Sequence, residues 1–310
     1  MTRPATTAVL TPAHVLRQLE RLAGLVAGEP AAWAAAVPGA ATLAEALYAR
    51  WYTEPPAVIG PARVADPPLH AGSLVAVLRA ARTADRPAAE PWVVLAAAPD
   101  GSVMAQRAET VRQVRSGEYV ARARPGVPPA PGELVEVLAP LEMVDAERGL
   151  WWTFTDVPPE PPFGRVYLDA RAATVGRVVR AVGDALGGTS HQLKCPVLPG
   201  GYARVDAVVV YHRRADRPAV LDALRNAPLE CLLDDPVPPL TCPLGPGVSW
   251  ADDPGTTLSF GEHVCRALAA GIERSAAGWA AATVEQRTGR LLSALTDAGV
   301  DPGTPWEAGT

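Results

Sequence analysis

The first part of the chain has apolar residues at helical spacing. Thr11-Pro12 is a pair typical of a helix start, with threonine as N-cap and proline at the first helical position. Apolar residues then recur three or four positions apart, as one helix face requires: Val15, Leu16, Leu19, Leu22 and Leu25. A second helix is predicted over 41–52, ending at Glu54-Pro55-Pro56, and a third over 74–82.

Short β-compatible runs dominate the next part, at 92–98, 102–109, 118–124, 133–139, 150–156 and 165–170. Asp100-Gly101 and Ser116-Gly117 mark turns beside them. The run at 203–212 is the clearest strand, because it is almost entirely apolar or β-branched. Helices are predicted over 174–186, 218–226, 260–276 and 281–298, and the proline-rich segment 234–257 is expected to be irregular.

This order of elements favours an α+β fold. Short connections between the runs indicate a largely antiparallel twisted sheet, with helices packed on one face. We expect a helical N-terminal portion over 1–88, a candidate for binding a peptide or partner, and an α+β domain over 89–310. No convincing linker separates the two portions, so one compact unit is expected.

The basic residues are unusual. Lysine and arginine total 28, and Lys194 is the only lysine, which leaves 27 arginines. Arginine carries a surface charge as well as lysine does, but it stays protonated at all ordinary pH values. Lys194 is therefore a candidate for a functional role that requires losing a proton. The alternative is that a single lysine remains in the sequence by chance.

Composition excludes several classes of protein. The net charge of -5, without a dense basic run, argues against a nucleic-acid surface. The apolar runs are too short to span a membrane, and no apolar signal core follows the first residues, so we expect a cytoplasmic protein. The four cysteines are scattered without metal-ligand spacing, which indicates reduced thiols and no metal site. No nucleotide-binding loop or hydrolase motif is present, so no cofactor is expected.

Candidate chemistry gathers between 164 and 212. Arg165 and Tyr167 are two apart and share a strand face, and Lys194 follows within HQLKCP. Arg204 lies at the start of the strand predicted over 203–212, while Tyr211 falls on the opposite face of that strand. His191 precedes Lys194 by three positions. Several basic groups facing one site would bind an anion such as phosphate.

Each of these residues also has an ordinary structural explanation. Arg204 and Asp206 could form a salt bridge across strands. Tyr167 could be a half-buried strand aromatic, and His191 an exposed loop residue. Val205, Val209 and the tryptophans of GLWW are assigned to the core.

In order along the chain, GRVYL, HQLKCP, YARVDAVVVYH and a C-terminal stretch containing DPGTTLSFG resemble the HopA-type effector family. The resemblance covers roughly 90–275, and Asp253 to Gly261 is its most characteristic part. This family includes plant-pathogen effectors and lyases of class V lanthipeptide and thioamitide biosynthesis.

The resemblance implies a phosphothreonine lyase, which removes phosphate from phosphoserine or phosphothreonine by β-elimination without a metal or cofactor. Lys194 would match the family's base, with Arg165 and Arg204 matching its phosphate-binding basic residues. Tyr167 stands where the pattern has histidine and would serve as proton donor, with Tyr211 as a weaker candidate.

A second departure lies in the helix after Ser259. Val264 stands where the pattern often carries arginine, so Arg266 or His263 would have to contact the phosphate instead. The N-terminus of that helix could also help to hold it.

The resemblance also implies partners. The substrate would be a phosphorylated ribosomal precursor peptide, whose modified residues become dehydroalanine and dehydrobutyrine. A separate Ser/Thr kinase-like phosphotransferase would supply the phosphate, and a cyclase is a further candidate partner. Two alternatives remain open: a non-catalytic subunit that binds the peptide and scaffolds the kinase, and an enzyme that forms a Schiff base on Lys194.

Overall fold

The computed structural model describes residues 11–54, 71–83, 89–123, 127–138, 141–155 and 159–308. Within these residues the chain forms two antiparallel sheets and helices, which confirms the predicted α+β class. The predicted stop at Pro55-Pro56, the boundary near residue 88 and the expected strand ends at 124, 139 and 156 lie outside the described residues.

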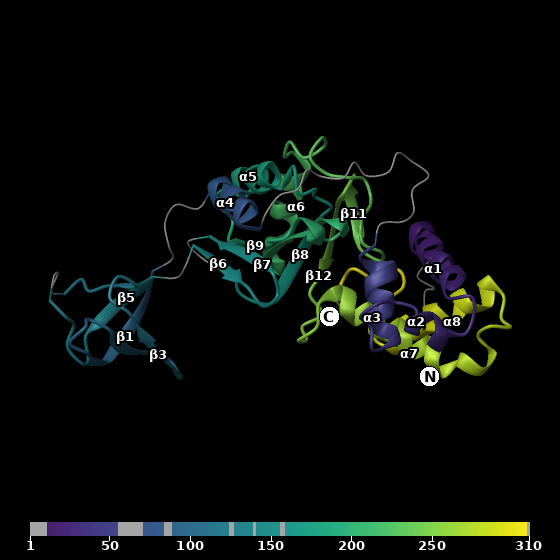
Figure 1. Cartoon of the computed structure of the whole chain (residues 1–310), viewed down its shortest axis with the longest axis horizontal. Coiled ribbons are helices and arrows are strands. Elements are labelled where there is room, and N and C mark those ends of the chain that lie inside the picture. The colour runs from purple at the N-terminus through teal and green to yellow at the C-terminus, as the bar shows by residue number, and fades with distance from the viewer. Residues whose placement is uncertain are drawn as a thin grey trace, which may run out of the picture.

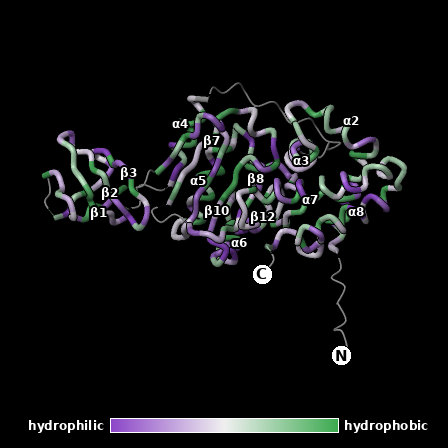
Figure 2. The backbone as a smooth tube through the Cα atoms, turned by 90° about the horizontal axis from the view of Figure 1, so that it is seen from below, coloured by the Kyte–Doolittle hydropathy of each residue, from purple (hydrophilic) through white to green (hydrophobic). Residues whose placement is uncertain are grey.

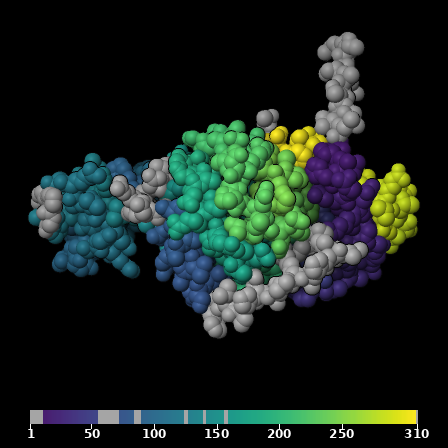
Figure 3. Space-filling model, turned by 90° about the horizontal axis from the view of Figure 1, so that it is seen from above, coloured from purple at the N-terminus to yellow at the C-terminus, as the bar shows by residue number. Residues whose placement is uncertain are grey.

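The smaller sheet has the order β3-β2-β1-β5-β4. It is built from β1 (Ala89–Ala97), β2 (Val103–Arg107), β3 (Thr110–Val114), β4 (Tyr119–Val120) and β5 (Leu134–Leu138). Its inner face has a core of its own, centred on Trp92, Val94 and Val135. The sheet lies at one end of the molecule, and Figure 3 shows it as a projecting lobe.

The larger sheet has seven strands in the order β11-β12-β8-β10-β9-β7-β6. They are β6 (Glu142–Asp145), β7 (Leu150–Phe154), β8 (Phe163–Leu168), β9 (His191–Pro196), β10 (Val208–Arg213), β11 (Cys242–Gly245) and β12 (Val248–Asp252). β8 and β10 lie near its centre, and every residue of β12 is buried. The Pro-rich segment predicted to be irregular thus contributes two strands, which corrects that expectation.

Helices cover both faces of this sheet, so the prediction of one covered face was wrong. One face packs on α4 (Ala71–Ala81), α5 (Val175–Ala185) and α6 (Arg217–Arg225). Toward the other lie α1 (Ala13–Leu25), α2 (Pro30–Ala35), α3 (Leu43–Leu47), α7 (Phe260–Arg274) and α8 (Val284–Asp297). In Figures 1 and 2 the large sheet separates these last helices from the small sheet.

Local sequence explains several helix ends. Ser259 and Glu262 form a capping box at the start of α7, and Thr283 and Gln286 form another at α8. The first helix begins one residue later than predicted, with Pro12 as its N-cap and no side-chain cap. The helix predicted over 41–52 starts at Leu43 and changes at Tyr48 into a π-helix, η1 (Tyr48–Tyr52). Short π-helical segments often occur at functional sites.

Candidate functional site

The strand register aligns two rows of side chains on the face of the large sheet that points toward α7. One row crosses the sheet from Ser249 through Tyr167, Val209 and Lys194 to Trp152. The adjacent row runs Ala251, Arg165, Tyr211, Gln192 and Phe154. Residues paired across strands share a face, so the register places four of the predicted site residues together: Lys194, Tyr167, Arg165 and Tyr211.

Lys194 lies toward the more open end of its row. Its Nζ lies 5.8 Å from the ring centroids of both Trp152 and Tyr211, a distance typical of cation–π contact. Its side chain is half-buried, and it makes no hydrogen bond or ion pair with the described residues. The only lysine is therefore a partly accessible amine held between two aromatic rings.

Tyr211 lies between the two cationic side chains. The Cζ of Arg165 lies 5.0 Å from the Tyr211 ring centroid, and Trp152 packs against the same ring at 5.5 Å. The prediction that placed Tyr211 opposite Arg204 along one strand therefore needs correction. The strand starts only at Val208, so Arg204 lies outside it, and Tyr211 shares the face of Lys194.

Arg165 already has a carboxylate partner. Its Nε donates to Asp253 Oδ2 at 2.9 Å, its second guanidinium nitrogen bonds the same oxygen, and both side chains are about 90 % buried, being 11 % and 10 % exposed. Burial alone would lower the pKa of Arg165, but Tyr167, Tyr211 and Asp253 together raise it, so the guanidinium stays charged. In the sequence, Asp253 stood out only as the first residue of the stretch Asp253 to Gly261. Its ion pair with Arg165 was not predicted.

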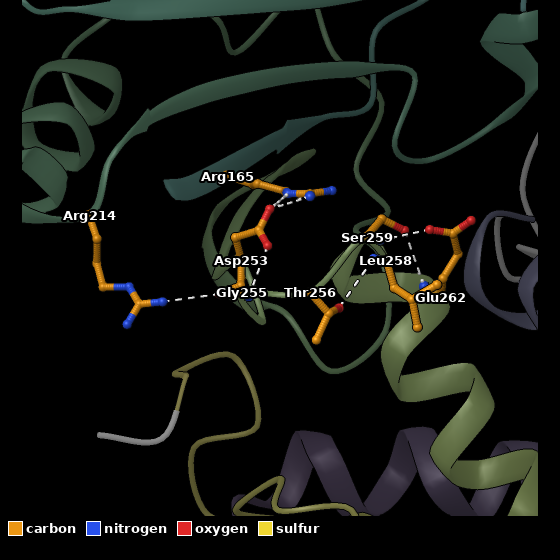
Figure 4. A network of polar contacts seen from close by, with 8 residues as sticks. All are labelled: Arg165, Arg214, Asp253, Gly255, Thr256, Leu258, Ser259 and Glu262. Atoms are coloured by element: carbon orange, nitrogen blue, oxygen red, sulfur yellow. Dashed lines mark hydrogen bonds and ion pairs between the residues drawn. The ribbon is translucent and has the colours of Figure 1, made fainter. Parts of the chain in front are cut away.

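The loop after Asp253 ties this ion pair to the start of α7 (Figure 4). Asp253 Oδ1 accepts the Gly255 amide at 3.1 Å, and its carbonyl accepts from Arg214 at 3.0 Å. Four residues after Gly255, the Ser259 hydroxyl and the Glu262 carboxylate cap the α7 N-terminus. The Glu262 carboxylate would repel a second anion there, which argues against the idea that this N-terminus helps to hold a phosphate.

Tyr167 lies at the closed end of the row. Its side chain is only 3 % exposed, and its hydroxyl has no hydrogen-bond partner of ordinary geometry among the described residues. Tyr52 of η1 belongs to the same buried cluster, and the hydroxyls of Tyr52 and Tyr167 lie against each other. Burial raises the pKa of Tyr167 above its ordinary value, although Arg165 opposes this, so the phenol keeps its proton.

Arg204 lies apart from the β10 strand, directly after a short 3-10 helix, η2 (Pro199–Ala203). It donates two hydrogen bonds to Asp206, at 2.8 and 2.9 Å, and one to the Tyr48 hydroxyl at 2.9 Å. Its ion pair is thus local, two residues apart, rather than across strands. The Tyr48 contact connects the N-terminal helices to this arginine.

The remaining candidates lie elsewhere. His191 alternates with Lys194 on β9 and belongs to the opposite face, where its Nδ1 contacts the Thr189 carbonyl at 2.8 Å. Arg266 is exposed on α7 and lines a groove with Tyr48 rather than the Lys194 site. Both predicted phosphate contacts are therefore separated from Lys194. His263 and the buried Val264 also contribute no side chain to it.

A family model described as the HopA1 effector protein family matches residues 153–306, which include every strand from β8 to β12. The chain belongs to the HopA1 effector family through these residues. The match starts and ends later than the resemblance over 90–275, so the small sheet lies outside it.

HopA-type effectors also share the fold. An effector from Pseudomonas syringae pv. syringae strain 61 aligns with a TM-score of 0.53 at 14 % identity, covering 97 % of this chain and 100 % of its own. One from Pseudomonas syringae pv. tomato strain DC3000 aligns with a TM-score of 0.50 at 13 % identity, covering 95 % and 100 %. Among curated proteins, none matches this chain.

The HopA1-type chain has no group of metal-ligating side chains among its described residues. In the same residues no helix is both long enough and apolar enough to cross a membrane.

Proposed function

We propose that this HopA1-type protein is a phosphoserine/phosphothreonine lyase that acts on a phosphorylated precursor peptide. The observation that carries the proposal is the unpaired Lys194 amine, placed on one sheet face beside Arg165 and Tyr211. A β-elimination needs a base and a compensating positive charge within reach of one substrate residue.

In the proposed reaction, the neutral amine of Lys194 takes the Cα proton of the phosphorylated residue. The electron pair of the Cα–H bond forms the Cα=Cβ bond, and the Cβ–O bond breaks. Phosphate leaves with the electrons of that bond, and the proton remains on Lys194. The peptide then contains dehydroalanine or dehydrobutyrine.

Arg165 would compensate the charge of the departing phosphate, with Arg204 as a second cation. Both arginines are engaged by carboxylates, Asp253 and Asp206, so phosphate must compete with these or share the guanidinium. Tyr167 keeps its proton and would serve as donor, provided that the substrate reaches beneath the helices that bury it.

These carboxylates favour the second candidate function. A subunit whose arginines are already neutralised could bind a precursor peptide without turning it over, and scaffold the kinase that phosphorylates it. In either function a separate phosphotransferase and, for ring formation, a cyclase would act on the same peptide.

The product distinguishes the functions. The purified chain is incubated with synthetic phosphothreonine and phosphoserine peptides. The products are then treated with a thiol, and their masses are measured by mass spectrometry. Elimination gives an alkene that adds the thiol. Hydrolysis gives the free hydroxyl residue and no adduct, which would indicate a phosphatase. Tight binding of the unchanged peptide would support the scaffold.

A further inference from the structure

The small sheet ends in an open strand edge. Among the strands of the described residues, in the order β3-β2-β1-β5-β4, β3 has a neighbour on only one side. Four of its five residues are exposed, and it pairs with β2 without a bulge. Proteins usually protect an exposed edge with proline, a bulge, a very short strand or charged side chains. β3 has no proline and no bulge and carries one charged residue, Arg112, whereas the other edge, β4, has only two residues.

The hairpin geometry shows which backbone groups of β3 are free. Ala108 and Glu109 form a two-residue loop, so the flanking pair Arg107 and Thr110 exchanges both of its hydrogen bonds. Pairs alternate along an antiparallel ladder, so Val111 and Gln113 stand in non-hydrogen-bonded pairs. Their N–H and C=O groups point away from β2. Among the described residues, none of these groups forms a hydrogen bond with another backbone group.

The side chains beside this edge are basic and apolar. Residues 107–115 contain three arginines against one glutamate, in a chain whose net charge is -5. Arg107 is paired with Glu90. Arg112 and Arg115 are exposed, and their guanidinium groups have no carboxylate partner in the described part of the chain, although the Glu118 carboxylate accepts the Arg115 backbone N–H at 3.0 Å. Val111 is 47 % exposed and continues an outward row with Gln106 and Val93, which is 41 % exposed.

We propose that β3 is a docking edge for an extended acidic peptide segment, which adds to the small sheet as a further strand. The free groups of Val111 and Gln113 would supply backbone hydrogen bonds, and Arg112 and Arg115 would select negative charge. The small sheet contacts chiefly itself, so this edge lies apart from Lys194. Identifying the segment with a flanking stretch of the precursor peptide rests on the proposed function; binding at β3 does not.

The test uses a fluorescein-labelled peptide of alternating valine and glutamate, with binding to the full chain followed by anisotropy. Val111→Pro/Gln113→Pro removes both outward N–H groups while sparing the bonds to β2, and Val111→Ala/Gln113→Ala is the matched control. The proline variant should bind about tenfold or more weakly than the alanine variant, since several backbone hydrogen bonds are lost.

Two further measurements keep this test decisive if the proline variant folds poorly. A peptide N-methylated at every residue should bind the unaltered chain weakly, because neither of its edges has donors. Lys194→Arg should bind the unmodified peptide as tightly as the unaltered chain does, which separates docking from elimination. Absent binding of the valine–glutamate peptide, or equal binding by the proline and alanine variants, would overturn the proposal.

Discussion

Asp253→Asn tests whether the motif aspartate holds Arg165 in place. The substitution keeps the size of the side chain but removes the negative charge beside a guanidinium that is only 11 % exposed. Breaking a buried ion pair by neutralising one partner costs about 3–5 kcal/mol, because the other charge stays buried. Asparagine retains one acceptor oxygen, so we expect a loss near the lower end, about 3 kcal/mol, or about a hundredfold in the folding equilibrium.

The assay is urea unfolding followed by tryptophan fluorescence, since seven of the eight tryptophans lie outside residues 89–138. Asp297→Asn is the matched control, because it breaks another arginine–aspartate pair, with Arg274 at 2.9 Å, whose side chains are 62 % and 56 % exposed. Such exposed pairs contribute about 0–1 kcal/mol. Equal losses in the two variants would refute the assignment of Asp253 as the buried counter-ion.

Two further predictions concern packing and pH. Gly261→Ala should lower the free energy of unfolding by about 1–3 kcal/mol, because its Cβ would overlap the Tyr52 ring. Gly289→Ala, a helical control with open space around it, should instead raise it by up to about 1 kcal/mol, and urea unfolding measures both. Burial lowers the pKa of His191 and of His212 below 6.5. The folded state then binds fewer protons than the unfolded state, so stability should fall as pH drops below about 6.5. His191→Gln should flatten that decline, and an unchanged pH profile of unfolding would contradict this explanation.

Sequence patterns located the helices better than the strands. The periodicity over 174–186 and 260–276 predicted α5 and α7 to within two residues at each end. β12 was missed because proline- and glycine-rich segments flank it, although its five residues are all buried. Its place beside β8 depends on long-range pairing that local composition does not encode.

The site was predicted in part for the same reason. Alternation along β8 correctly placed Arg165 and Tyr167 on one face. Which face of β9 and β10 meets them depends on register between strands distant in sequence, so Tyr211 was undervalued and His191 included. The partners of the arginines were not predictable from spacing either, since Asp253 lies 88 positions from Arg165.

The rate of alkene formation by Lys194→Arg tests the central claim most directly. The variant keeps the charge and an aliphatic stem between Trp152 and Tyr211, but arginine cannot release its proton. Thiol-trapped product from a phosphothreonine peptide should form about 10²–10⁴-fold more slowly than with the unaltered chain, while the control Arg274→Lys stays unaffected. Elimination at an undiminished rate by Lys194→Arg would contradict the assignment of Lys194 as the base.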